Sequence, residues 1–132
     1  MSFRIIQLEN LEVNIKYDKD CLSLGFIGAH VKKTMDDAYE KTLWSQNGSI
    51  EIKNILDNNI ILNDKDIILS MNISFDSYMY KNILVLPFLK NGDIFLEIEF
   101  KNLEENINIR CSEMEILLIN DPEYIRHIKK ME

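Results

Sequence analysis

The strongest constraint in this sequence is a strict alternation of apolar and polar side chains. Its longest example runs from Ile67 to Phe75, where the odd-numbered positions are apolar and Ser70, Asn72 and Ser74 stand between them. Successive side chains of a β-strand point to opposite faces, so this spacing predicts a strand with its odd-numbered side chains in a core. A chain with many such segments buries its apolar faces by building sheets.

Further alternating segments and short apolar runs along the chain predict about eight strands. The segments are Phe3–Leu8, Leu11–Tyr17, Cys21–Ile27, Ser49–Ile55, Ile67–Phe75, Ile83–Leu89, Asp93–Phe100 and Ile107–Leu118. We expect turns at Gln46–Ser49 and above all at Asn91-Gly92, because an Asn-Gly pair tolerates the positive φ of a two-residue hairpin. The second turn would join Ile83–Leu89 to Asp93–Phe100.

In the last of these strands the inward parity changes. Ile109 and Cys111 are apolar at odd positions, whereas Met114 and Ile116 continue the pattern at even positions. A slip of one residue within a strand requires a β-bulge or a corner between sheets. We place it at Ser112–Glu113.

Two segments lack alternation and carry helix signals. Thr34–Trp44 begins with a suitable N-cap and has apolar residues at helical spacing, which favours one short central helix. Near the C-terminus, Asp121 and Pro122 suit the N-cap and first helical positions, and Tyr124 and Ile128 lie four residues apart. We therefore expect a short C-terminal helix.

These segments predict one domain, residues 1–132, of the all-β class with mainly antiparallel pairing. We expect a β-sandwich or a flattened barrel of about eight strands, with the C-terminal helix and, as an option, the central one. No helical segment long enough for parallel crossovers separates the strands, which argues against an α/β architecture.

Net charge and hydropathy indicate which kinds of partner this chain could bind. The net charge is −7, which disfavours binding to a phosphate backbone and suits a basic protein partner. No apolar run approaches the roughly 20 residues that span a bilayer, and the N-terminus lacks the apolar stretch of a secretory signal. We expect a cytoplasmic protein with neither nucleic acid nor membrane as partner.

The residues that usually carry chemistry are few. Cys21 and Cys111 lie in alternating segments and are interpreted as reduced core cysteines. His30 and His127 have no nucleophile at motif spacing, so we interpret both as ordinary surface or edge histidines. These four residues form no paired zinc motif, and we expect no cofactor.

Calcium is an alternative, because acidic and amide side chains gather in the turns. These residues are Asp18, Asp20, Asp57, Asn59, Asp64 and Asp66. They could pool oxygen ligands, but they match no EF-hand loop, and such residues are common in turns for backbone reasons.

Four glutamates on the predicted C-terminal strands form the candidate partner-binding surface: Glu97, Glu99, Glu113 and Glu115. They alternate with apolar residues and are expected to share an outward face. Paired carboxylates can act as acid and base in glycosidases, but a solvated acidic surface that docks a basic partner is the favoured interpretation.

The run Gly92–Phe100, the strand after it and Asp121–Ile125 resemble the C-terminal half of small bacterial β-proteins. The resemblance covers about a third of the chain and consists mostly of strand pattern. A glycine of that pattern near Ile119–Asn120 is missing here. The resemblance implies an all-β domain and no particular activity.

The favoured function is a non-catalytic protein-binding domain of bacterial type, an immunity- or antitoxin-like partner of a basic protein. The first alternative is a small-ligand or Ca²⁺-binding β-module. The second is a small hydrolase, which would need His30 or His127 beside a carboxylate in a cleft. A homodimer formed through an edge strand is compatible with each of them.

Overall fold

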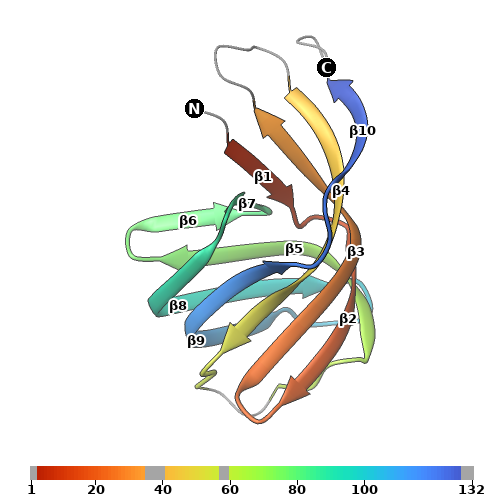
Figure 1. Cartoon of the computed structure of the whole chain (residues 1–132). Coiled ribbons are helices and arrows are strands. Elements are labelled where there is room, and N and C mark those ends of the chain that lie inside the picture. Colours follow the sequence, from red (N-terminus) through yellow and green to blue (C-terminus); the bar gives the residue numbers. More distant parts are fainter. Residues whose placement is uncertain (1–2, 35–40, 57–59, 129–132) are drawn as a thin grey trace.

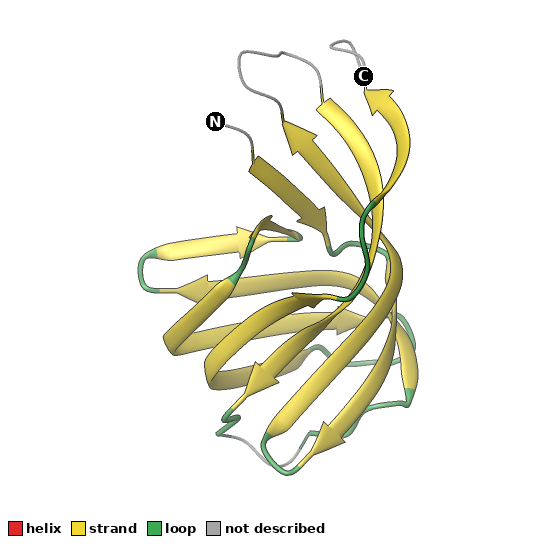
Figure 2. Ribbon diagram, in the orientation of Figure 1, coloured by secondary structure: helices red, strands yellow, loops and turns green. Residues whose placement is uncertain are grey.

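The computed structural model describes residues 3–34, 41–56 and 60–128, and it contains ten strands. The strands are β1 (Phe3–Gln7), β2 (Leu11–Asp18), β3 (Cys21–Thr34), β4 (Lys41–Lys53), β5 (Lys65–Phe75), β6 (Tyr78–Lys81), β7 (Ile83–Leu86), β8 (Leu89–Phe100), β9 (Ile107–Leu118) and β10 (Glu123–Ile128). Figure 2 shows that the described chain is built from strands and loops. The prediction of an all-β, antiparallel fold is confirmed.

Six strands close into a barrel, in the order β4-β9-β8-β5-β2-β3, because β3 also pairs with β4. The remaining four strands lie outside this ring: β1 pairs with β3, β7 with β1, β10 with β4, and β6 with β5. Of the two architectures expected from the sequence, the closed barrel is the one observed. Closure leaves no free edge within the ring itself.

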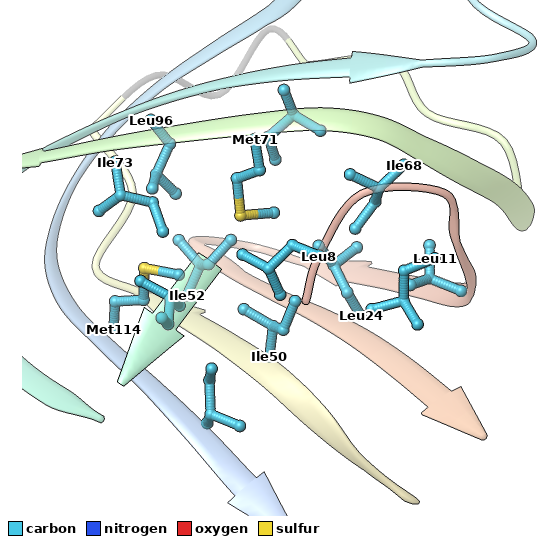
Figure 3. Packing of buried hydrophobic residues seen from close by; sticks show 14 of the residues in the cluster. Leu8, Leu11, Leu24, Ile50, Ile52, Ile68, Met71, Ile73, Leu96 and Met114 are labelled. Atoms are coloured by element: carbon cyan, nitrogen blue, oxygen red, sulfur yellow. The ribbon is translucent and has the colours of Figure 1, made fainter. Parts of the chain in front are cut away.

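Apolar side chains from all six barrel strands, together with Leu8 from the loop between β1 and β2, fill its interior. Figure 3 shows ten of them pointing toward one another: Leu8, Leu11, Leu24, Ile50, Ile52, Ile68, Met71, Ile73, Leu96 and Met114. Most of these side chains have no exposed surface. The interior of the ring is thus a packed core.

β3 and β4 are the longest strands, and both continue beyond the barrel (Figure 1). β3 leaves the ring at a bulge between Phe26 and Ala29, where Gly28 has a φ of 73° and its N–H donates to Oδ1 of Asn47 over 2.9 Å. Past the bulge, β3 exchanges β2 for β1 as its partner. The strands β7-β1-β3-β4-β10 form an open sheet, called here the extension.

The turn predicted at Asn91-Gly92 is wrong, because these residues lie inside β8. Gly92 has a φ of 140° at a bulge between Asn91 and Ile94, opposite β9. A bulge, like a hairpin turn, can require a positive φ that glycine adopts readily, so the Asn-Gly pair indicated an irregular backbone but not a turn. The expected hairpin partner, β7, pairs with β1 instead.

The turn predicted at Gln46–Ser49 is also wrong, since these residues are in β4. Gly48 sits between β3 and β9, and a Cβ on it would collide with the Leu117 carbonyl oxygen. The glycine therefore permits a close approach of two strands. It does not mark a turn.

The inward parity of β9 changes at Ser112–Glu113 as predicted: Cys111 is buried on one side of this pair and Met114 on the other. The irregularity lies in the β8–β9 ladder at that level, and the extra residue belongs to β8.

The alternation in β5 is less regular than predicted. Ile68 is fully buried, whereas Ile67 and Leu69 are half-buried, and the register with β8 shifts between Ile68 and Ser70. From Met71 onward the odd-numbered positions point inward as expected.

The predicted C-terminal helix is wrong: Glu123–Ile128 is strand β10, paired with β4. Short isolated helices are marginal in water, and the edge of β4 offers this segment a ladder of backbone hydrogen bonds, interrupted by one irregularity between Tyr124 and Arg126. Of the optional central helix, Thr34 ends β3 and Lys41–Trp44 opens β4, while residues 35–40 lie outside the described part.

Candidate functional site: a cleft in the extension

Four strands of the extension and the segments that follow β7 and precede β10 line an open cavity of about 350 Å³. Its lining combines apolar, aromatic and basic side chains: Arg4, Val31, Lys33, Trp44, Leu86, Pro87 and Pro122. The volume falls within the range of small-molecule sites. We call this cavity the cleft.

The strand register explains why residues distant in the sequence meet here. Arg4 pairs with Leu86 on one side and with Lys33 on the other, and Lys33 pairs in turn with Thr42. These four side chains form a row across β7, β1, β3 and β4.

A second row lies two residues along each strand, toward the barrel. It contains Leu84, Ile6, Val31, Trp44 and Tyr124. Leu84, Ile6 and Val31 are fully or almost fully buried. Residues two apart share one face of a strand, so the first row lies on the same inner face, farther from the core.

Trp44 is the aromatic wall of the cleft and the only tryptophan of the chain. Its ring meets Tyr124 edge to face, with centroids 5.3 Å apart and planes at 76°. Its Nε1–H donates to Oγ1 of Thr42 over 2.7 Å. The indole is therefore fixed in place, and its polar group is already in use.

Arg4 and Lys33 are the charged residues of the cleft, and both are half-buried. They stand directly opposite each other on β1 and β3. Within the described residues neither forms an ion pair, whereas Arg110 binds Asp93 through two 2.8 Å contacts and Lys53 binds Glu113 at 3.3 Å. Like charges directly opposite on neighbouring strands destabilise a sheet.

The four predicted glutamates all point outward, but the structure separates them into two groups. Glu97 and Glu99 lie beside Asn72 and Ser70 of β5. Glu113 faces Asn91, six residues before Glu97 on β8, which is about 20 Å along an extended strand. One continuous row of four carboxylates does not form.

The second group includes an acidic residue that the sequence reasoning missed. Glu115 stands directly opposite Glu51 on β4, and Glu113 stands opposite Lys53. The Ser23 hydroxyl donates to the Glu51 carboxylate. We call Glu51, Glu113 and Glu115 the acidic strip.

Neither histidine belongs to the cleft lining, but His127 stands beside it, because its register partner Thr42 lies in the first row and holds the Trp44 indole. His30 is exposed and borders a depression of about 130 Å³ that includes Glu9, with no hydrogen bond between the two. His127 is exposed on β10 and pairs in register with Thr42.

Both cysteines are free, but only one is in the core. Cys111 is buried, and burial raises the pKa of its thiol to about 11, so it is a poor nucleophile. Cys21 is exposed beside Asp20, which corrects its predicted core position.

The described residues contain no group of three or more metal-ligating side chains. Of the proposed calcium ligands, Asp57 and Asn59 lie outside the described residues, and Asp18, Asp20 and Asp64 are exposed.

Asp66 is the one acid of that set with a clear structural role. It is buried, and its carboxylate accepts hydrogen bonds from the backbone of Ile67, from the Asn63 side chain and from the backbone and side chain of Asn102. Burial alone would raise the pKa of Asp66, but these donors outweigh it and lower the pKa. Asp66 ties two loops together.

No protein-family model, curated protein or solved structure matches this chain. The described part of the chain has no helix long and apolar enough to cross a membrane. Fold and cleft define a small antiparallel β-barrel with an open sheet at one end.

Proposed function

We propose that this protein is a non-catalytic binding domain that holds a small organic ligand in the cleft. The observation that carries the proposal is the lining itself, in which a fixed indole and four apolar side chains surround a concave space beside two cations. Apolar walls with a few placed polar groups are the usual composition of a ligand pocket.

The same lining favours binding over catalysis. The described lining residues supply no carboxylate, imidazole, thiol or hydroxyl, the groups that most often act as general base or nucleophile, since Arg4 and Lys33 are its only ionisable members.

Trp44 allows a direct test. Because it is the only tryptophan, its fluorescence reports on the cleft alone. A fragment library of small aromatic and aliphatic molecules should contain ligands that change this fluorescence and stabilise the fold, by about 2.7 kcal/mol at 100 times Kd.

The matched control is Trp44→Phe, which removes the optical signal and keeps an aromatic wall. Calorimetry should still detect binding to this variant. A library that neither changes the fluorescence of the native protein nor raises its unfolding temperature would contradict the proposal.

The acidic strip supports a second candidate, the docking of a basic protein in the manner of an immunity protein or antitoxin. Glu51 and Glu115 are directly opposed like charges, and a basic partner would relieve their repulsion. Binding should weaken in Glu51→Gln with Glu115→Gln and stay unchanged in Glu97→Gln with Glu99→Gln. Recovery of no stoichiometric partner from native lysate would count against this candidate.

A further inference from the structure

We propose that the ligand of the cleft is a small organic acid, with its carboxylate or phosphate between Arg4 and Lys33 and a flat apolar body against Trp44. This inference rests on the proposed function and adds the chemical class of the ligand.

Arg4 and Lys33 bring two unpaired positive charges together in the cleft. Arg4 and Lys33 are paired across β1 and β3, are half-buried, and have no carboxylate partner among the described residues. The chain has 22 acidic and 15 basic residues, so acids for pairing are plentiful. Two opposed, unpaired cations in such a protein form a site that an anion would stabilise.

The side chains of Arg4 and Lys33 also have donor groups suited to an acid group. A guanidinium presents a planar fork that matches the two oxygens of a carboxylate or phosphate, and an ammonium adds a point charge. Arg4 and Lys33 are register neighbours in the outer row of the cleft. An acid group placed between them receives hydrogen bonds from both strands.

The apolar side chains of the cleft determine what the rest of the ligand can be. Val31, Leu86, Pro87 and Pro122 offer no side-chain hydrogen bond, and the Nε1–H of Trp44 is held by Thr42. The part of the ligand that lies against these residues therefore meets apolar side chains and an aromatic ring. A body without polar groups fits these walls, because a buried polar group without a partner is unfavourable.

Four probes separate the contributions of charge and body: phenylacetate, phenyl phosphate, the neutral isostere phenylacetamide, and inorganic phosphate. Binding is measured by Trp44 fluorescence and by calorimetry. One or both aromatic acids should bind at least tenfold more tightly than phenylacetamide and than inorganic phosphate, and added salt should weaken them. The stronger of the two acids identifies the acid group.

Arg4→Gln and Lys33→Gln should each weaken the aromatic acid about tenfold or more, and Arg4→Lys should restore part of the loss. The control is Lys32→Gln, the next residue on β3, which pairs with Ile5 and points to the opposite face. Its affinity should equal that of the native protein. Circular dichroism checks that each variant is folded.

The outcomes are distinct. If phenylacetamide or other neutral fragments bind as tightly as the acids, the ligand class is overturned while the proposed function stands. If inorganic phosphate binds as tightly as phenyl phosphate, the aromatic body is overturned. If only an acidic peptide such as oligoglutamate binds, the cleft docks proteins and the proposal is overturned. If no small molecule affects Trp44, both proposals fall.

Discussion

The barrel and the extension share strands β3 and β4, yet they differ in strand pairing and in the side chains of their inner faces. Within the ring each strand has a partner on both sides, and its inner face is apolar. In the extension β7 and β10 end the sheet path, and the inner face carries two opposed cations beside an aromatic ring. The comparison separates the part that stabilises the fold from the part that is suited to binding.

The largest expected effect is on the free energy of unfolding, when isoleucine is replaced by alanine in the barrel and in the extension. Ile50→Ala in the barrel removes a fully buried side chain and should lower the free energy of unfolding by about 3 kcal/mol. Ile125→Ala in β10 removes a side chain that is 43% exposed and should cost about 1 kcal/mol or less. Urea denaturation measures both. Equal losses would contradict the assignment of stability to the barrel.

The second prediction concerns the hydrogen bonds by which Asp66 of β5 holds Asn63 and Asn102. Asp66→Asn keeps the shape of the side chain but removes charge-assisted hydrogen bonds, and it should lower the free energy of unfolding by about 2 kcal/mol at neutral pH. Asp64→Asn, at an exposed neighbouring position, is the control.

The loss of stability in Asp66→Asn should depend on pH. Because the pKa of Asp66 is lowered in the fold, its ionised form stabilises the protein above the ordinary value of 3.8, and that contribution is lost as the pH falls through the lower folded value. The gap between native and Asp66→Asn proteins should therefore be full near neutral pH and shrink below about pH 4. A gap independent of pH would show that the charge plays no part.

The smallest effect is expected in the cleft. Arg4→Gln removes one of two opposed cations and should raise the free energy of unfolding by about 0.5 kcal/mol. Lys32→Gln should leave it unchanged. Thermal denaturation compares the two, and a loss above about 1 kcal/mol in Arg4→Gln would make Arg4 a structural residue.

Much of the barrel could be predicted from the sequence, because side-chain alternation is a local property. It located most of the strands and the parity change in β9. Hairpin and helix signals failed where tertiary pairing decided the outcome, as at Gly48 and Gly92 and in β10.

The cleft could not be predicted, because its members meet only through strand pairing. Arg4, Lys33 and Leu86 come from three separate strands, and nothing local links them. Trp44 was assigned to an optional helix, which concealed its place on a sheet face. The only local hint concerned Arg4, a basic residue between the apolar residues Phe3 and Ile5.

The closure of the barrel also has a consequence for biosynthesis. β4 completes the ring by pairing with β9, and β5 to β8 lie between them in the chain. During synthesis, the edge of β4 that pairs with β9 stays unpaired until β9 has been made. Long-range pairing of this kind slows folding and exposes unpaired strands to other chains. The nascent protein is thus most vulnerable to aggregation just before its last barrel strand arrives.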